Sequence, residues 1–223
     1  MDHKLFMRGI TRFLAGLLLV GALLFLPAGT LRYPQGWLLI GILFVPMFAA
    51  GLVMMKVNPG LLEKRLSVDE KESEQRVVIL LSGIMFLAAF LLAGLSFRFG
   101  WVMLPFKASI VAAAVFLTAY ALYAEVLREN TYLSRTIEVQ EGQKVIDTGL
   151  YGIVRHPMYM VTVLLFLAMP LVLGSILSFA VMFCYIPIIA KRIRNEEHVL
   201  EIGLPGYREY EKKVRFRLIP FVW

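Results

Sequence analysis

Six apolar segments dominate the chain and alternate with short turns or charged loops. They cover residues 13–28, 37–55, 77–97, 106–127, 158–173 and 176–190. A bilayer core about 30 Å thick needs about 20 helical residues to cross it, so we expect an all-α polytopic integral membrane protein with about six transmembrane helices. Gly174 and Ser175 alone separate the last two segments, which predicts a C-terminal helical hairpin. The first arm of this hairpin has 16 residues and is short for a full span.

The composition agrees with this pattern and indicates one membrane domain. Of the 223 residues, 59% are hydrophobic and 17% are charged, which is unusual for a soluble domain. No low-complexity linker divides the chain. We therefore expect a single domain, 1–223, with a four-span N-terminal part, 1–130, and a cofactor-binding catalytic part, 131–223. Pro170 and Pro187 are predicted to bend the two hairpin arms, and a cytoplasmic amphipathic helix is expected after Glu197.

Basic residues are concentrated in alternate connections between the apolar segments. The N-terminus, the two long loops and the C-terminal segment hold 20 of the 23 lysines and arginines, and the other connections hold only Arg32, Arg98 and Lys107. By the positive-inside rule, both termini and any site built from the long loops lie on the cytoplasmic side of the cell membrane. Membrane topology thus explains the formal net charge of +7, and no nucleic-acid partner is expected.

One candidate site lies just before the fifth apolar segment. Arg155 and His156 precede Pro157, which suits the first turn of a helix because its missing N–H is not needed there. Free amides at that helix start would attract an anionic group such as a carboxylate or ribose oxygens. Tyr159 adds a phenol one turn later. Taken alone, the segment is more typical of a basic cap that anchors a helix to lipid headgroups.

A second polar cluster follows the sixth apolar segment. Arg192 and Glu196 are four residues apart and share one helix face. Glu197 is rotated by about 100° from Glu196, so we expect it to pair with Arg194 or to face water. An ion pair of this spacing is ordinary on a helix surface. The hairpin, however, brings this cluster to the Arg155 end, and the combination favours a site for a ligand with both an ammonium and a carboxylate.

Other chemistries find little support in the sequence. His156, Glu197 and His198 do not have the His-Glu-x-x-His spacing of a zinc site, so no metal is expected. The single cysteine, Cys184, lies in an apolar run and is predicted to be a buried structural thiol. Neither a glycine-rich dinucleotide fingerprint nor a P-loop occurs.

The motifs after residue 138 resemble a known family. They are Gly-Leu-Tyr-Gly-Ile-Val-Arg-His-Pro-Met-Tyr at 149–159, Arg-Ile-Arg-Asn-Glu-Glu at 192–197, Gly206-Tyr207 and Tyr210. Together they resemble the isoprenylcysteine carboxyl methyltransferase family, in its prokaryotic branch, over about residues 138–220. Phospholipid methyltransferases are relatives of this family. Its members are integral membrane enzymes that use S-adenosyl-L-methionine.

The resemblance also implies roles for individual residues. Arg192 is expected to bind the acceptor, and Arg192 and Glu196 are the implied catalytic residues. Leu204-Pro205-Gly206 carries one residue more than the family pattern, so both glutamates, Glu196 and Glu197, remain candidates for the cofactor contact. The cofactor-binding residues implied are Gln143, Lys144, Val145, Ile146, Tyr151, Arg155, His156, Pro157, Met158, Tyr159, Glu196 and Glu197.

The implied reaction is methylation of the carboxylate of an isoprenylcysteine-like or other lipidic acceptor held within the membrane. A carboxylate is already ionised at neutral pH, with a pKa near 4, and needs no general base. Arg192 favours such an acceptor because an arginine would repel a protonated amine. The alternatives are phospholipid N-methylation, an NADPH-dependent sterol-type reductase with Lys191 and Arg194 near the 2′-phosphate, and a non-enzymatic membrane protein.

Overall fold

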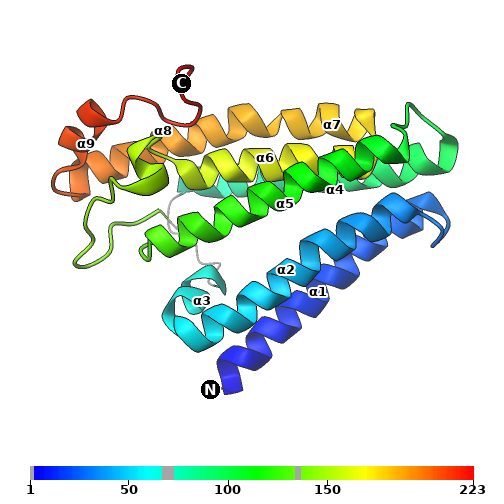
Figure 1. The fold of residues 1–223 in the computed structure, drawn as a ribbon, viewed down its shortest axis with the longest axis horizontal. Helices are drawn as coiled ribbons and strands as arrows, with labels where there is room; N and C mark the ends of the chain where they lie inside the picture. Colours follow the sequence, from blue (N-terminus) through cyan, green and yellow to red (C-terminus); the bar gives the residue numbers. More distant parts are fainter. Residues whose placement is uncertain (1–2, 67–72, 134–136) are drawn as a thin grey trace.

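The computed structural model describes residues 3–66, 73–133 and 137–223, which fold into a bundle of long helices (Figure 1). These residues contain no β-strand, so the all-α prediction is confirmed. The elements are α1 (His3–Ala28), α2 (Pro34–Val57), α3 (Pro59–Leu66), α4 (Ser73–Phe99), α5 (Phe106–Glu129), the 3₁₀ turn η1 (Gly149–Gly152), α6 (Pro157–Val172), α7 (Ile176–Phe183), α8 (Tyr185–Gly203) and α9 (Tyr207–Lys213).

The long helices have the dimensions of membrane spans. Among the described residues, five stretches are long and apolar enough to cross a bilayer: α1, α2, Val77–Phe99 of α4, α5, and Ile176–Gly203, which joins α7 to α8. Helix α6 is apolar but has only 16 residues. The chain is therefore an integral membrane protein, and the predicted polytopic helical architecture with a C-terminal hairpin is confirmed, with α6 as its short arm.

The second hairpin arm is interrupted where α7 gives way to α8. Cys184 lies between them, and its amide donates to the Val181 carbonyl at 3.1 Å. This bond spans three residues instead of four, so the turn is tighter than a turn of α-helix. Pro187 has no N–H for the Phe183 carbonyl four residues earlier, which favours an interruption of the helix at this point. Cys184 is exposed on the helix surface, so the prediction of a buried thiol is wrong. An apolar run does not distinguish a lipid-facing position from the protein core, because lipid tails are as apolar as leucine.

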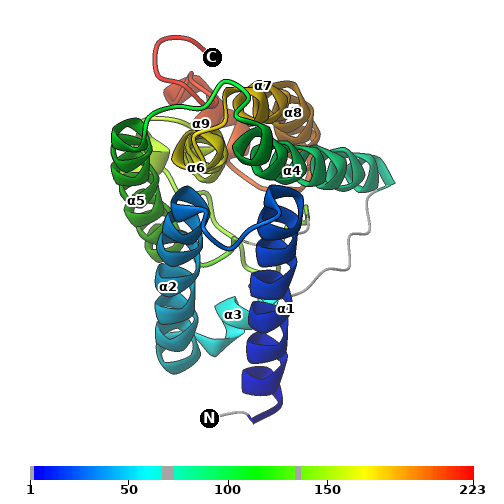
Figure 2. The same ribbon diagram turned by 90° about the vertical axis from the view of Figure 1, so that its right-hand side faces the viewer.

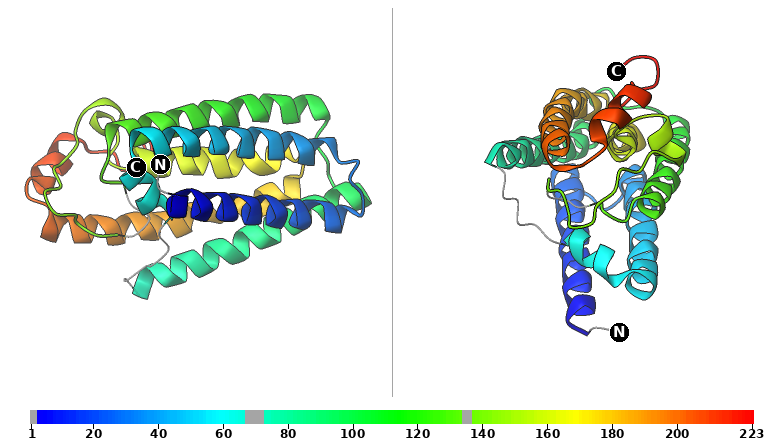
Figure 3. Two further views of the ribbon diagram at one scale, coloured as in Figure 1. Left: turned by 90° about the horizontal axis from the view of Figure 1, so that it is seen from below. Right: turned by 90° about the vertical axis from the view of Figure 1, so that its left-hand side faces the viewer.

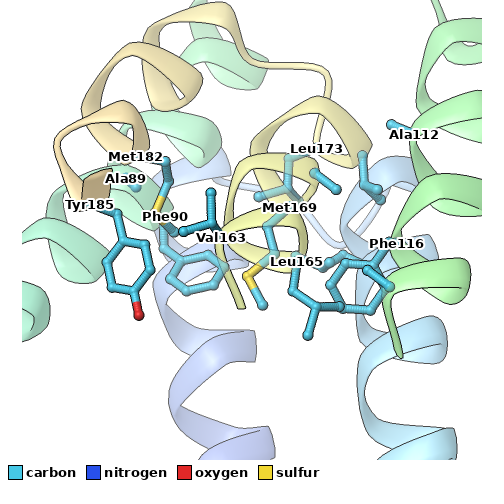
Figure 4. Packing of buried hydrophobic residues seen from close by; sticks show 14 of the residues in the cluster. Ala89, Phe90, Ala112, Phe116, Val163, Leu165, Met169, Leu173, Met182 and Tyr185 are labelled. Carbon is cyan, nitrogen blue, oxygen red and sulfur yellow. The ribbon is translucent and has the colours of Figure 1, made fainter. Parts of the chain in front are cut away.

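Helix α6 lies at the centre of the hydrophobic core (Figure 2). It packs against α5 most extensively and also contacts α2, α4, α7 and α8. Figure 4 shows side chains of α4, α5, α6, α7 and α8 meeting around Val163 and Met169. Buried alanines such as Ala89, Ala93 and Ala112 lie in these contacts, as expected where membrane helices approach closely.

The N-terminal hairpin of α1 and α2 leans away from the other helices (Figures 1 and 2). It is fastened near the α1–α2 turn, where α1 packs on α4. A Cβ at Gly94 would lie 2.6 Å from the Leu24 carbonyl oxygen, so only glycine allows this approach. The helices therefore meet closely at one end of the hairpin and diverge toward the other.

The four basic parts of the chain converge on one end of the bundle. Both termini, the end of α2, the end of α5 and the start of α6 lie toward the left of Figure 1. Arg98, in the last turn of α4, and Lys107, in the first turn of α5, belong to the opposite end. The end that carries the termini is also the one that carries the candidate site.

Candidate active site

A cavity opens at the end of the bundle where α6 begins and α8 ends. Its walls come from three parts of the chain: the segment between α5 and α6, the first turn of α6, and α8 with α9. Figure 3, right, shows these elements gathered at the end of the bundle that faces the viewer. The predicted convergence of the two hairpin ends therefore produces a hollow lined by polar and aromatic side chains.

The start of α6 is covered by the C-terminal tail, residues 214–223. The amides of Arg155 and His156 donate to the carbonyls of Phe216 and Arg217, at 2.8 and 2.9 Å. Both residues are buried, at 8% and 5% exposure. Pro157 is the first residue of α6, as predicted. Two amides that the sequence assigned to an anionic ligand are thus already occupied by the tail.

Glu197 is the buried centre of an ion cluster. One carboxylate oxygen, Oε1, accepts from Arg155 Nε at 2.8 Å and lies 2.7 Å from Arg155 Nη2 and 3.2 Å from His156 Nε2. The other, Oε2, accepts from Arg217 Nε at 2.6 Å. Glu197 is 2% exposed and does not line the cavity. The expectation that it pairs with Arg194 or faces water is therefore wrong, because the wheel angle could not reveal the tail that covers this face.

Arg192, Tyr159 and Glu196 form a second polar group, which does line the cavity. Arg192 Nε donates to the Tyr159 hydroxyl at 2.9 Å, and that hydroxyl donates to Glu196 Oε2. The His156 ring stacks on Tyr159, with centroids 5.7 Å apart. A cation and a carboxylate on adjacent turns of α8 are thus held by one phenol of α6, which places opposite charges side by side at the cavity wall.

The segment between α5 and α6 forms the wall that faces them. Gln143, Lys144, Val145 and Ile146 all line the cavity, as the family resemblance implied. A tight turn precedes them, in which the Gln143 amide donates to the Gln140 carbonyl at 3.0 Å. The turn needs a positive φ of 71° at Gly142, which glycine adopts without strain. The turn at residues 140–143 thus directs this stretch toward the cavity.

Tyr151 is positioned by hydrogen bonds from the end of α5 and from α9. Asn130, at the end of α5, donates to its hydroxyl at 3.1 Å, and Tyr210 of α9 donates to its carbonyl at 2.7 Å. The Glu129 carboxylate accepts from the Leu150 amide at 3.1 Å, which ties η1 to α5. These bonds fix the Tyr151 ring at the cavity wall.

Helix α9 contributes two buried tyrosines, and one hydroxyl has no partner. Tyr207 and Tyr210 pack with Leu204 and Val214 against Val145. Burial raises the pKa of both phenols, so both remain protonated donors at neutral pH. Tyr207 lines the cavity, and its hydroxyl is buried and makes no hydrogen bond. A buried polar atom without a partner is costly, which suggests that a ligand completes its bonding.

Most residues singled out from the sequence meet at this cavity, and several others were missed. Those that line it are Gln143, Lys144, Val145, Ile146, Tyr151, Arg155, His156, Met158, Tyr159, Arg192 and Glu196, whereas Pro157 and Glu197 do not. Lining residues that were not predicted as site residues include Asn130, Tyr132, Glu138, Leu200, Tyr207 and Tyr210. Tyr207 and Tyr210 belong to the sequence motif, but the motif does not indicate where their side chains point. Among the residues described, no three His, Cys, Asp or Glu side chains come together as a metal site.

Part of the chain matches a known protein family. Residues 110–202 match the isoprenylcysteine carboxyl methyltransferase (ICMT) family. The resemblance indicated by the motifs is therefore confirmed for this stretch, which runs from α5 to the end of α8. It includes Tyr159, Arg192 and both glutamates, and it leaves α1–α4 and α9 outside the ICMT match.

A second comparison connects the chain with a reductase. A stretch of 91 residues, 40% of this chain, is 31% identical to the Delta(14)-sterol reductase TM7SF2 of Mus musculus. It spans 22% of the length of that reductase. The likeness thus concerns one part of each protein.

Proposed function

We propose that this protein is a membrane methyltransferase that uses S-adenosyl-L-methionine to methylate the carboxylate of an isoprenylcysteine-like or other lipidic acceptor, on the cytoplasmic side of the membrane. The observation that carries the proposal is the Arg192–Tyr159–Glu196 group at the cavity wall. It combines a cation for a carboxylate acceptor with an anion for a positively charged cofactor. The ICMT match over residues 110–202 supports the same reading.

The cavity residues fit the proposed cofactor. Glu196 offers a carboxylate to an ammonium group, and the Tyr207 hydroxyl offers an unused hydrogen bond to a ribose or carboxylate oxygen. Tyr151, Val145 and Ile146 supply the apolar and aromatic surface that a purine ring needs. When bound there, S-adenosyl-L-methionine would supply a methyl group carried on a positively charged sulfur.

The remaining catalytic work is positioning. Arg192 would orient the ionised acceptor, and Tyr159, bonded to both Arg192 and Glu196, would set the distance between the acceptor and cofactor sides. Holding two reactants in line contributes as much as about 7–11 kcal/mol to lowering a barrier. No general base is required, because a carboxylate with a pKa near 4 is ionised at neutral pH.

The size of the cavity implies that one wall moves when the cofactor binds. Its volume is about 90 Å³, whereas pockets for small molecules typically measure about 300–1,000 Å³. The wall formed by residues 137–147 lies between helices rather than within one. We infer that this segment moves outward to admit the cofactor and then closes on it.

Binding of S-adenosyl-L-methionine to the purified protein in detergent tests the cofactor. Calorimetry on the unaltered chain should detect binding, and Glu196→Gln should weaken it about tenfold or more, because a hydrogen bond to a charged group contributes about 1.5–3 kcal/mol. Glu201→Gln is the matched control, since Glu201 belongs to the same helix and does not line the cavity. Equal affinity for both variants would contradict the proposed role of Glu196.

The product of methyl transfer tests the acceptor. Membrane extract incubated with the protein and methyl-labelled cofactor should yield a labelled lipid whose label is released by mild base, because esters hydrolyse and N-methyl groups do not. A base-stable label would instead indicate phospholipid N-methylation.

The sterol reductase likeness raises a second candidate, an NADPH-dependent reductase. The 2′-phosphate of NADPH needs basic residues at the cavity, but Lys191 and Arg194, suggested for this role by the sequence, do not line it and are exposed. Lys144, Arg155 and Arg192 are the basic lining residues described, and Arg155 is paired with Glu197. NADPH titrated under the same conditions should give no binding that competes with S-adenosyl-L-methionine.

A further inference from the structure

A second cavity lies between the N-terminal hairpin and the α5–α6 pair. Its volume is about 450 Å³, which is in the range of small-molecule pockets. It is lined by α1, α2 and α3 on one side and by α5 and α6 on the other. Apart from Arg12, Thr162, Tyr120 and Tyr123, the lining side chains are apolar. A cavity of this composition suits a hydrocarbon and does not suit water.

The apolar pocket and the candidate active site are lined by successive turns on one face of α6. Met158 and Tyr159 line the active-site cavity, and Thr162, Leu165 and Met169 line the apolar pocket. At 100° per residue, all five positions fall within about 120° of one another. A ligand lying along this helix face would reach from the polar group at Tyr159 to the apolar pocket.

Helix α5 shows the same continuity. Phe116, Tyr120 and Leu127 line the apolar pocket, and Asn130, at the C-cap of the same helix, lines the active-site cavity. Both helices therefore present one end to the active site and the turns that adjoin it to the pocket.

The pocket ends near the middle of the bundle. Phe116 lies about halfway along α5 and is fully buried. Figure 4 shows it beside Leu165 and Met169 of α6. Phe13 and Leu43, from the middle turns of α1 and α2, also line the pocket. The lining residues of α1, α2 and α5 extend no further than these middle turns, which limits the depth of the pocket measured from the active site.

We propose that the pocket binds a single hydrocarbon chain of the methyl acceptor, and that the N-terminal hairpin sets the chain length accepted. The proposal rests on the methyltransferase function proposed above, because the acceptor's carboxylate would lie at Arg192. The observation that carries it is the continuous α6 face from Tyr159 to Met169. Of the 24 residues that line this pocket, 15 come from α1–α3, which lie outside the ICMT match, so acceptor selection would reside largely in a part of the chain that the match does not cover.

Two glycines of α2 provide a matched test. Gly51 lines the pocket, and a Cβ built there meets no atom within 4 Å, so Gly51→Leu would project into the pocket. Gly41 lies in the same helix, also has no atom within 4 Å of a built Cβ, and does not line the pocket. Gly41→Leu is therefore the control for adding a leucine to α2. Leucine favours a helix over glycine, so both variants should fold.

The probes are S-alkyl N-acetylcysteines of increasing linear chain length. Their binding is measured without cofactor, by displacement of a fluorescent fatty acid, and their methylation is measured with S-adenosyl-L-methionine. Gly51→Leu should weaken binding of the long-chain probes by roughly fourfold for each methylene displaced and leave the shortest unchanged. Gly41→Leu should match the unaltered protein at every length. Ala124→Phe, which fills the same pocket from α5, provides a second variant.

The outcomes separate this inference from the proposed function. A length profile that Gly51→Leu and Ala124→Phe leave unchanged, with methylation intact, overturns the pocket assignment and leaves the methyltransferase proposal standing. A profile that shifts as expected without any methylation supports the pocket and overturns the function. Equal effects of Gly51→Leu and Gly41→Leu would show that the pocket does not determine the length of the hydrocarbon chain that binds.

Discussion

Two adjacent glutamates on α8 serve different purposes, and their surroundings decide which. Glu196 lines the cavity and bonds to Tyr159, whereas Glu197 is buried among Arg155, His156 and Arg217. The second carboxylate joins three segments that are distant in sequence: the start of α6, α8 and the C-terminal tail. It therefore holds the site together without being at the site.

This division predicts opposite consequences for the two residues. Glu197→Ala should destabilise the protein by about 3–5 kcal/mol, because it leaves the buried Arg155 guanidinium without its closest counterion. Glu196→Ala should leave the melting temperature in detergent nearly unchanged and abolish detectable cofactor binding. Thermal unfolding and calorimetry on both variants measure the two effects. If both variants melted equally early, the separation of roles would be wrong.

The hydroxyls of Tyr207 and Tyr210 form a second contrasting pair. Tyr207→Phe removes a buried hydroxyl that has no partner, so stability should be unchanged or slightly higher, while cofactor affinity should fall about three- to tenfold. Tyr210→Phe removes a donor to the Tyr151 carbonyl and should instead lower stability by about 1 kcal/mol. Melting curves with and without S-adenosyl-L-methionine distinguish them. A Tyr207→Phe variant that binds the cofactor normally would exclude this hydroxyl as a ligand contact.

The sequence predicted which residues lie at the site better than it predicted their hydrogen-bond partners. The spacing of Arg192 and Glu196 predicted a shared face, and both line the cavity. The partners of Glu197 could not be predicted, because they depend on how residues 214–223 fold back over α6. The unpartnered Tyr207 hydroxyl was equally out of reach, since a motif names a tyrosine without showing what its oxygen contacts.

Among the larger elements, the wall between α5 and α6 is the one that we expect to respond to ligand. The cavity that it borders, about 90 Å³, is too small for a nucleoside. Hydrogen exchange in peptides covering residues 137–147 should therefore slow when S-adenosyl-L-methionine is added, while exchange in α1 should stay the same. Faster exchange in the wall, or no change despite saturating cofactor, would contradict closure of this segment.

Close packing of α1 on α4 makes another prediction at the scale of helices. Gly94→Ala should cost about 1–3 kcal/mol, because the added methyl would press on the Leu24 carbonyl at 2.6 Å and force the helices apart. Gly83→Ala, in the same helix, meets no atom within 4 Å and should stabilise by up to about 1 kcal/mol through helix propensity. Unfolding in detergent measures both. Similar melting temperatures for the two variants would show that the helices can separate without cost.

For the molecule as a whole, hydrophobic periodicity predicted the spans because a bilayer imposes their length. The short arm of the hairpin was also predicted, since α6 has 16 residues, as many as the apolar segment 158–173, and begins one residue earlier. The burial of individual residues was not visible: Cys184 lies in an apolar run yet is exposed. In a membrane, both the outside and the inside of the bundle are apolar, so hydropathy alone does not distinguish them.

The remaining property of the whole molecule is its orientation, which the distribution of basic residues predicts. Because 20 of 23 lysines and arginines belong to one set of segments, the end of the bundle with both termini should face the cytoplasm. The single native cysteine makes this measurable, since Cys184→Ser yields a cysteine-free background. In intact cells, a membrane-impermeant maleimide should label Leu31→Cys, in the exposed α1–α2 turn, and should not label Glu209→Cys, on the exposed face of α9. Permeabilised cells should expose both. The reverse pattern would place the site outside, away from the cytoplasmic pool of cofactor, and would contradict the proposed function together with the orientation.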